Sequence, residues 1–337
     1  MTANGGNDHE HRLLELLSGK WVTAAISAAA ELGLADVLAA GPMELSELAR
    51  KLECDSSALL RLLRVLGGEG LVEIDPQGRC SITEVGAQLR QDKLRDLARF
   101  VGSPFVWSPW ASLPSALRSD VSAFEAIHGA SLFDYLDSHP TEAHLYHSAV
   151  DAFTRREAHA LIDAFDFSQV GTIVDVGGGL GTLLSELAER WPTMRCILFD
   201  RPAVVEQARA SFANTPLAHR IEAIGGDFFT SVPSGADAYV VKHVVHNWGD
   251  DQAIEVLQRC ASALRPGGHV LIVESILLPG HRRDGTPLLD LEMLVLCGAG
   301  RERSKPEFRT LLRRAGLKLV STRDLAGMAR LLVAAPL

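Results

Sequence analysis

The pattern of apolar and polar positions is most regular after Val170, where short apolar runs alternate with amphipathic segments. The runs GTIVDVG, RCILFD, RIEAIGGD, DAYVVK and HVLIVESI are typical of buried strands. Between them, TLLSELAERW, AVVEQARASF and DDQAIEVLQRCASAL show the spacing of helices. This alternation predicts an α/β fold with a mostly parallel, doubly wound sheet, in which ligands bind at the carboxyl ends of the strands.

The first hundred residues have a different pattern. Residues 13–40 are rich in alanine and leucine at helical spacing, with Gly33 as a break. Next, MELSELARKLECDSSALLRLLRVLGGEGLVEI predicts a helix, a turn, a helix and a strand, with Ser46 and Asp55 as helix caps. This order is typical of a winged helix, which either binds DNA or serves as a scaffold or dimerisation module. Residues 92–164 look helical, and most of their aromatic side chains are expected in a core.

The charge of the chain favours the scaffold interpretation. Its 33 Lys and Arg residues stand against 42 Asp and Glu residues, for a formal net charge of -9. A DNA-binding surface needs clustered cations, and Arg61 and Arg64 are the clear candidates on the second helix of the winged-helix pattern. We therefore expect no nucleic-acid partner.

The cysteines and the N-terminus bear on location. The five cysteines are widely spaced and form no CxxC pair, which predicts reduced thiols in a cytoplasmic protein and no metal site. The opening MTANGGNDHEHR lacks the pattern of a leader sequence, and no apolar run looks long enough to span a bilayer. We therefore expect no membrane partner.

A glycine-rich turn in VDVGGGLGTLL follows the first strand of the α/β region. Glycines let the backbone turn sharply and let a ligand approach the N-terminus of the next helix. Gly177, Gly179 and Gly181 give GxGxG, whereas the dinucleotide fingerprint GxGxxG requires glycine where Thr182 stands. The turn indicates a nucleotide-type ligand and favours one other than NAD.

Acidic residues follow successive strands of the same region. Asp200 ends the second strand, where a carboxylate can accept both ribose hydroxyls of an adenosine, a need that NAD and S-adenosylmethionine share. In GDFF, Asp227 can accept from an adenine amino group while Phe228 packs on the ring. Asp175 lies near the expected place of a sulfonium ligand's amino acid end. Together these residues favour a nucleoside ligand.

The segment VVKHVVHNWGDDQA, after the fourth strand, carries the candidate chemistry. A histidine with the ordinary pKa of about 6.5 suits proton removal at neutral pH, and His246 is the candidate base. A phenol is a poor nucleophile until its proton leaves, while a sulfonium methyl donor is already activated, so positioning oxygen, carbon and sulfur in line is the remaining task. Glu274, after HVLIV, could fix the tautomer of the histidine, and Glu302 could flank the same ring.

An ordered set of motifs resembles the plant-type caffeate and flavonoid O-methyltransferases and their bacterial polyketide and phenazine relatives. The set comprises the winged-helix module, VDVGGGLG, FDRPAVVE, GDFF, KHVVHNW, ALRPGG, ESILLP, DLEMLVL and GRERSKPEF, and it spans nearly the whole chain. The resemblance implies a Rossmann-like S-adenosylmethionine-binding domain at 166–337, a helical linker at 101–165 and a dimerisation domain at 1–100. It also implies a homodimer.

Site residues follow from the same resemblance. It implies that His246 is the base and that Glu274 and Glu302 bracket it. The implied cofactor-binding residues are Gly177, Asp200, Arg201, Gly226, Asp227, Phe228 and Lys242, and the implied substrate-binding residues are Phe153, Asn247, Met293 and Cys297. The implied reaction is methylation of a hydroxyl on a small aromatic metabolite, with S-adenosylhomocysteine as the second product.

Two positions depart from the plant pattern, and three rival functions stay open. Asn247 stands where the plant enzymes have aspartate, and Arg201 stands where they have leucine. Some bacterial relatives without the histidine are hydroxylases or decarboxylases that still bind the cofactor, and this is the first rival function. The second is an NAD-dependent oxidoreductase, and the third is a regulator that keeps the fold as a ligand sensor.

Overall fold

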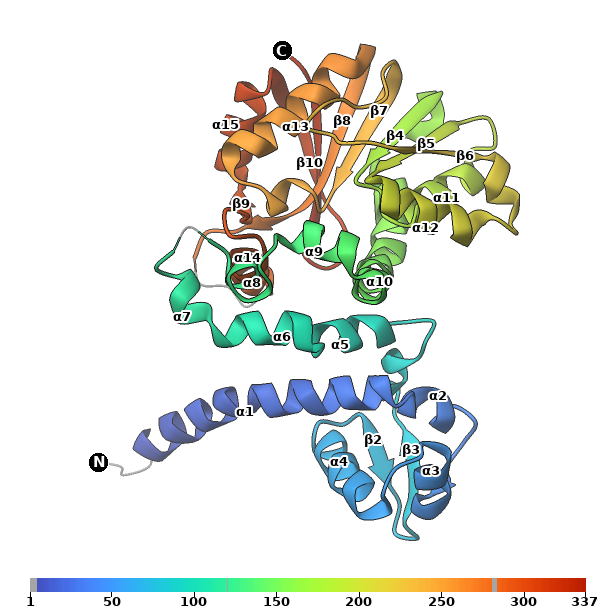
Figure 1. Cartoon of the computed structure of the whole chain (residues 1–337), viewed down its shortest axis with the longest axis vertical. Helices are drawn as coiled ribbons and strands as arrows, with labels where there is room; N and C mark the ends of the chain where they lie inside the picture. Colours follow the sequence, from blue (N-terminus) through green and yellow to red (C-terminus); the bar gives the residue numbers. More distant parts are fainter. Residues whose placement is uncertain (1–4, 120, 281–283) are drawn as a thin grey trace. The chain divides into compact units, whose positions relative to one another are not determined.

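The computed structural model describes residues 5–119, 121–280 and 284–337. The chain folds into two compact units, coloured by sequence in Figure 1. The first unit comprises Met1–Trp107 and His144–Ala152, and the second comprises Ser108–Ala143 and Phe153–Leu337. The segment expected as a linker, residues 101–165, is thus shared between both units, and the expected domain boundaries stay predictions.

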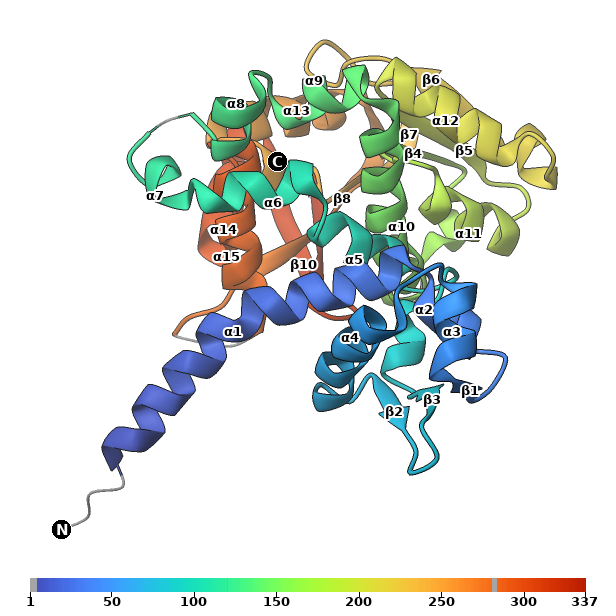
Figure 2. The same cartoon turned by 60° about the horizontal axis from the view of Figure 1, so that its bottom comes forward.

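The first unit contains the predicted order of helix, turn, helix and strand. Its elements are α1 (Gly5–Glu31), α2 (Leu34–Leu38), β1 (Met43–Glu44), α3 (Leu45–Lys51), α4 (Ser56–Gly68), β2 (Val72–Ile74), β3 (Arg79–Ile82), the 3-10 turn η1 (Gly86–Leu89) and α5 (Arg95–Val101). The three strands form an antiparallel sheet in the order β1-β3-β2. Within this unit α1 runs beside α5, which Figure 2 shows.

The caps of the two central helices differ from each other. Asp55 caps α4 as predicted, accepting a hydrogen bond of 2.8 Å from the backbone N of Ala58. The prediction that Ser46 caps α3 is wrong, because that helix begins at Leu45. Glu44, the preceding residue, still pairs with β3, so the chain turns directly from strand into helix without a side-chain cap.

Helix α1 carries an exposed apolar surface. Its large exposed side chains are Leu13, Leu14, Leu16, Leu17 and Trp21, each more than half exposed. By length and composition alone, the segment Asp8–Glu31 could cross a membrane, with 17% of its most apolar window buried. The expectation that no stretch is long enough to span a bilayer is therefore wrong. Core helices and leader sequences pass the same test, so the finding is weak evidence for a membrane partner.

The second unit is built around one large sheet. The strands are β4 (Thr172–Val176), β5 (Arg195–Asp200), β6 (Ile221–Gly225), β7 (Ala236–Lys242), β8 (Leu264–Leu277), β9 (Arg303–Ser304), β10 (Leu317–Asp324) and β11 (Ala329–Pro336). They are ordered β10-β11-β8-β7-β4-β5-β6, and β9 pairs with β8. All neighbours are parallel except β11 with β8 and β10 with β11.

The strand order reverses between β4 and β7. From β4 the chain proceeds outward through β5 and β6, and it then returns to place β7 and β8 on the other side of β4. In open α/β sheets such a switch point leaves a crevice at the carboxyl ends of the two central strands. The glycine turn after β4 and the His246 segment after β7 therefore meet at one edge of the sheet.

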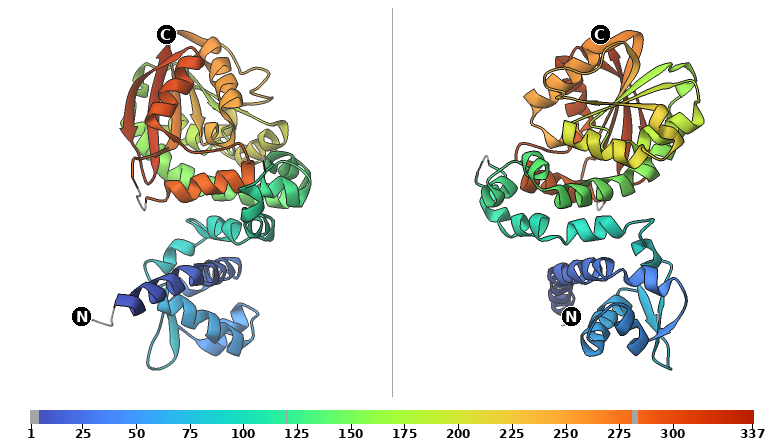
Figure 3. Two further views of the ribbon diagram at one scale, coloured as in Figure 1. Left: turned by 90° about the vertical axis from the view of Figure 1, so that its left-hand side faces the viewer. Right: turned by 45° about the vertical axis from the view of Figure 1, so that its right-hand side comes forward.

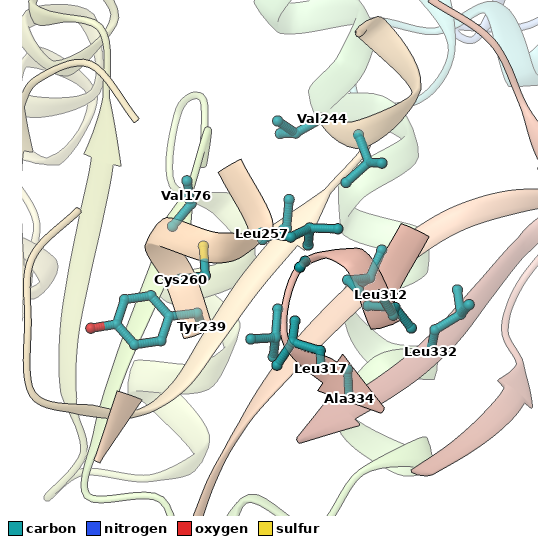
Figure 4. Close-up of a cluster of buried hydrophobic side chains, with 14 of the residues drawn as sticks. Val176, Tyr239, Val244, Leu257, Cys260, Leu312, Leu317, Leu332 and Ala334 are labelled. Carbon is teal, nitrogen blue, oxygen red and sulfur yellow. The ribbon is translucent and has the colours of Figure 1, made fainter. Parts of the chain in front are cut away.

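Helices cover both faces of this sheet, as Figure 3 shows. They are α11 (Thr182–Arg190), α12 (Pro202–Phe212), α13 (Asp250–Ala263) and α15 (Lys305–Arg314), whereas α14 (Thr286–Cys297) packs beside α8 (Ala123–His128). Figure 4 shows Leu257 and Cys260 of α13 and Leu312 of α15 packed with side chains from the strands. On the opposite face, Leu183, Leu184 and Leu187 of α11 are buried with the end of α10.

The middle of the chain is helical, as predicted. It forms α6 (Pro104–Ala111), α7 (Leu113–Ala116), α8 (Ala123–His128), α9 (Leu132–Ser138) and α10 (Pro140–Ala164). Together with the sheet, this confirms a Rossmann-like α/β fold with a mostly parallel sheet, preceded by a helical N-terminal domain. The antiparallel pair β10 and β11 and the helix α15 were not predicted from the sequence.

Candidate active site

The glycine turn leads from β4 into α11. Gly177 has φ of +70°, and a Cβ there would lie 2.6 Å from Cγ2 of Val244. Gly181 has φ of +80°, and its Cβ would lie 2.4 Å from the ring of Phe212. Only glycine fits both positions. By contrast, a Cβ on Gly179 would meet nothing within 4 Å in the described part of the chain, so the turn opens to free space just before the N-terminus of α11.

Asp200 is tied to this turn. One of its carboxylate oxygens accepts a hydrogen bond of 2.8 Å from the backbone N of Gly179, and the other accepts one of 2.7 Å from the backbone N of Arg201. Burial nevertheless raises the pKa of Asp200. Burial also raises the pKa of Asp175, inside β4, to about 7, although the nearby Lys242 opposes the shift. A buried carboxyl group, Asp175, and a partly buried one, Asp200, therefore stand at the turn, a setting that favours a cationic ligand.

The side chain of Arg201 points to α9. Its Nη2 lies 2.9 Å from Oδ1 of Asp134 and 2.5 Å from Oδ2 of Asp137. This arginine replaces the leucine of the plant pattern, and its ion pairs join α9 to the loop after β5. Its role in cofactor binding stays a prediction.

The adenine side of the predicted site follows β6. Asp227 is exposed, and it caps its own turn by accepting a hydrogen bond of 2.9 Å from the backbone N of Phe229. Phe228 packs edge-on against Trp248, with ring centroids 6.1 Å apart. A Cβ on Gly226 would lie 2.5 Å from the ring of Phe199, so the backbone there passes too close for a larger residue. The structure thus places aromatic surface beside the predicted adenine carboxylate.

His246 lies in η4 (Val245–Asn247), directly after β7, and is 7% exposed. Its Nδ1 is 2.7 Å from Oε1 of Glu302 and 3.4 Å from Oε2 of Glu274. The other oxygen of Glu274 accepts hydrogen bonds from the backbone N atoms of Val244 and His246, at 3.1 and 3.2 Å. The structure therefore brings together the three residues predicted to act in catalysis.

The two carboxylates beside His246 differ in their electrostatics. Burial would raise the pKa of Glu274, but His246 and His243 outweigh it and lower that pKa. Burial raises the pKa of Glu302, with only partial compensation from His246. Because Nδ1 of His246 donates to a carboxylate, the lone pair of the neutral ring lies on Nε2, which is the atom that can accept a proton.

Arg303 and the loop before it hold the His246 segment in place. Arg303 is fully buried, and it donates hydrogen bonds to the carbonyls of Val245, at 3.0 Å, and Trp248, at 2.7 Å. It also pairs with Asp250, and the backbone N of Arg301 donates to the carbonyl of His246 at 2.8 Å. Sequence reasoning missed Arg303, because charged residues surround it in GRERSKPEF and no local signal distinguishes the buried one.

Gly300 provides a direct test of this support. A Cβ there would lie 2.7 Å from the carbonyl oxygen of His246 and 2.9 Å from backbone atoms of Asn247, which cannot move aside as a side-chain tip can. Gly300→Ala is therefore expected to displace the base and lower kcat by about tenfold or more, since small misplacements are costly. The control in steady-state kinetics is Gly68→Ala at the end of α4, where a Cβ meets nothing within 4 Å in the described part of the chain.

A second buried charge cluster lies next to His246 and was not predicted. Glu157, on α10, contacts Nε2 of His243 at 3.0 Å and Nζ of Lys242 at 3.6 Å. Lys242 is buried, and its predicted cofactor contact stays a prediction. Polar atoms of His243, His246 and Glu274 lie within 4.8 Å of one another, and the ion pairs among these side chains account for that closeness. Nothing in the sequence pattern places Glu157 at this edge, because α10 precedes the sheet.

The predicted substrate residues lie on several elements. Asn247 donates from Nδ2 to the carbonyl of His243 at 3.1 Å. Sγ of Cys297, on α14, lies 3.6 Å from Oδ1 of Asn247. Met293, on the same helix, is buried, whereas Phe153 is 43% exposed. Another α14 residue, Asp290, accepts a hydrogen bond of 2.8 Å from the backbone N of Glu302 and was not predicted.

A cavity of about 750 Å³ lies elsewhere in the second unit. Its lining comes from the loop after β6 and from α13, including Thr230, Glu255 and Arg259. The predicted site residues are not part of this lining. The residues that converge on the switch point therefore define the candidate site better than cavity size does.

Comparison with known proteins agrees with this geometry. A family model of the O-methyltransferase domain matches residues 110–318, and one of the O-methyltransferase dimerisation domain matches residues 14–92. The chain is 37% identical over 310 residues to the phenazine O-methyltransferase PhzM of Lysobacter antibioticus, covering 91% of this chain and 90% of that protein. It is 39% identical over 322 residues to the 3-amino-4-hydroxybenzoate 4-O-methyltransferase of Streptomyces cremeus, covering 93% of this chain and 87% of that protein.

A solved structure shows the same fold with ligands bound. The O-methyltransferase NcsB1 from neocarzinostatin biosynthesis, in complex with S-adenosylmethionine and 2-hydroxy-5-methyl naphthoic acid, matches with a TM-score of 0.79 and 29% identity. The match covers 94% of this chain and 96% of that chain.

Proposed function

The chain belongs to the S-adenosylmethionine-dependent O-methyltransferase family, and on that premise we propose that His246 is the general base that activates a phenolic hydroxyl of a small aromatic metabolite. The observation that carries the proposal is the 2.7 Å contact between Nδ1 of the buried His246 and Glu302. This contact orients the ring and leaves Nε2 as the proton acceptor.

Different residues of this chain would have different roles in such a reaction. When bound, S-adenosylmethionine supplies a methyl group activated by a sulfonium charge. Nε2 of His246 takes the proton of the acceptor hydroxyl, and Glu274 and Glu302 then stabilise the imidazolium. General-base catalysis of this kind typically raises the rate by about 10²- to 10⁴-fold.

The glycine turn and the acids at the strand ends fit the cofactor. The open space at Gly179 admits a ligand, and Asp175, buried beside it, would favour a cationic group. We assign cofactor contacts to the set Gly177, Asp200, Arg201, Gly226, Asp227, Phe228 and Lys242. Asn247, Met293, Cys297 and Phe153 are assigned to the acceptor side, where the names of the relatives suggest phenazine-, benzoate- or naphthoate-like rings.

Calorimetry tests the cofactor assignment. S-adenosylhomocysteine is expected to bind with one site per chain, and NADH to show no heat of binding above dilution. Asp200→Asn should weaken the first interaction, because an amide is a poorer acceptor than a carboxylate for two ribose hydroxyls. Asp75→Asn, on the exposed turn between β2 and β3, is the control. Tight binding of NADH alone would overturn the assignment.

We also propose a homodimer formed through the N-terminal domain. The exposed apolar side chains of α1 lie in the segment matched by the dimerisation model, and burying them in a second copy removes them from water. Light scattering should therefore give twice the 36.4 kDa chain mass. Leu17→Asp with Trp21→Asp should shift the protein toward monomer, whereas Val320→Asp, at an exposed position of β10, should not. A clean monomer for the unchanged protein would refute the proposal.

A further inference from the structure

His243 occupies an unusual place beside the base. Its backbone has φ of +51°, a left-handed conformation that residues other than glycine rarely adopt. Two hydrogen bonds hold the residue there. Its backbone N donates to the carbonyl of Val273 at 2.9 Å, and its carbonyl accepts from Nδ2 of Asn247 at 3.1 Å. Strained backbone of this kind persists where surrounding contacts enforce it, and it clusters at functional sites.

The imidazole of His243 is clamped between two buried carboxylates. Its Nε2 lies 3.0 Å from both oxygens of Glu157, whose side chain is 10% exposed. Its Nδ1 lies 3.6 Å from Oε2 of Glu274, whose side chain is fully buried. Neither this Nδ1 nor this Oε2 has a hydrogen-bond partner within the described part of the chain. The contact between them is therefore mainly a charge interaction.

The same Glu274 oxygen also faces the proposed base. Oε2 of Glu274 is 3.4 Å from Nδ1 of His246, so the two imidazoles share one carboxylate, and their ring centroids are 5.4 Å apart. A charge on either ring at that distance opposes a charge on the other, because the surroundings are poorly solvated.

We propose that His243, held by Glu157, is a positively charged positioning residue that shares Glu274 with His246 and thereby limits how tightly His246 holds its proton. The inference rests on the proposed role of His246 as the base. Without a charged His243, no positive charge on that ring would offset the attraction of Glu274 for a proton on His246. The imidazolium formed in each turnover would then lose its proton less readily.

The charges around the pair support this assignment. Burial alone would lower the pKa of His243, but Glu157, with help from Glu274, raises it to about 9 against the opposing Lys242. Lys242 comes from β7, Glu157 from α10 and Glu274 from β8, and Glu302 contacts the same Nδ1 of His246 that Glu274 faces. Asp175 of β4 interacts with Lys242. The carboxylates of Glu157 and Glu274 thus face the side chains of Lys242 and His243.

The experiment is an NMR titration of histidine ring carbons in the full-length protein saturated with S-adenosylhomocysteine, with EDTA present to exclude metal ions. His243→Gln and His246→Gln assign the two signals. His243 is expected to stay charged up to about pH 9, while in His243→Gln the midpoint of His246 should rise by about one unit or more. His159→Gln, which removes an exposed histidine 3.2 Å from Glu186, is the matched control and should leave that midpoint in place.

A second variant distinguishes the effect of the charge on His243 from the effect of changing its side chain. Glu157→Gln should let His243 lose its proton and so shift His246 in the same direction, and the double variant Glu157→Gln with His243→Gln should shift it no further than His243→Gln alone. An unchanged His246 midpoint in His243→Gln, or an uncharged His243 at pH 7, would overturn the inference. Because the titration needs no acceptor, a protein that fails to methylate would refute the proposed function and leave this result standing.

The rate profile provides the corresponding kinetic readout. In His243→Gln, the acid limb of kcat should move to higher pH, with activity reduced at pH 7 and recovered near pH 9. A merely structural role would lower kcat at every pH alike.

Discussion

His246→Ala or His246→Gln is expected to lower kcat by about 10²-fold or more, as the loss of a general base does, while the affinity for S-adenosylhomocysteine stays within about twofold. The ring is buried and its Nδ1 is fixed by Glu302 at 2.7 Å, so proton removal depends on the free Nε2 of this one ring. Cofactor affinity should survive, because the predicted cofactor contacts come mainly from the turns after β4, β5 and β6.

Steady-state kinetics from pH 6 to 9 and calorimetry with S-adenosylhomocysteine check this expectation. His159→Ala is the matched control, since that histidine also contacts a glutamate but is 70% exposed and lies on α10. A rate that does not change with pH in the unmodified enzyme, or full activity in His246→Gln, would remove His246 from the mechanism.

Arg303→Met is expected to have the largest effect on stability. The methionine keeps much of the side-chain volume but leaves the buried carbonyl of Val245 and the part-buried carbonyl of Trp248 without their donor. Each such loss costs about 1 to 3 kcal/mol, so we expect the free energy of unfolding to fall by about 3 kcal/mol. For a domain of this size, such a loss lowers Tm by several degrees, roughly 6 °C. The base should also be displaced, because Val245 is the first residue of η4 and Trp248 directly follows it.

Thermal unfolding followed by circular dichroism measures the effect. Arg314→Met is the control, because Arg314 also pairs with an aspartate of α13 but its side chain is 54% exposed. Surface ion pairs of this kind contribute about 1 kcal/mol or less. If both variants melt within about one degree of the unmodified protein, the assigned support of η4 is wrong.

Local pattern predicted most of the second unit. Strands and helices between Val170 and Leu277 were recognisable because buried parallel strands are continuously apolar and the helices between them are amphipathic. The edge strand β10 and its neighbour β11 were missed. In LKLVSTRD, polar positions interrupt the apolar ones, and the strand is half exposed, so it lacks the signal of a buried strand.

The site was predictable where its residues follow strands, and hidden where they do not. His246 and Glu274 lie at the carboxyl ends of neighbouring parallel strands, so the topology alone brings them together. Glu157 reaches the same place from a helix 86 residues before His243, and no local pattern reports such a contact. Ser46 shows the opposite error, because a favourable capping residue was assigned a position that strand pairing at Glu44 had already fixed.

The rival functions differ in what they do to the methyl group. A hydroxylase or decarboxylase of the same family would bind the cofactor without consuming it, whereas an oxidoreductase would require NAD. Retention of His246 between two carboxylates favours transfer.

The most direct measurement is therefore incubation of the protein with S-adenosylmethionine labelled in its methyl group and a panel of hydroxylated benzoates, naphthoates and phenazines. We predict that label appears in a methoxyl group of at least one product, with one S-adenosylhomocysteine formed for each product, and that His246→Gln abolishes most of this transfer. Products that gain a hydroxyl or lose carbon dioxide while the labelled cofactor remains intact would contradict the account.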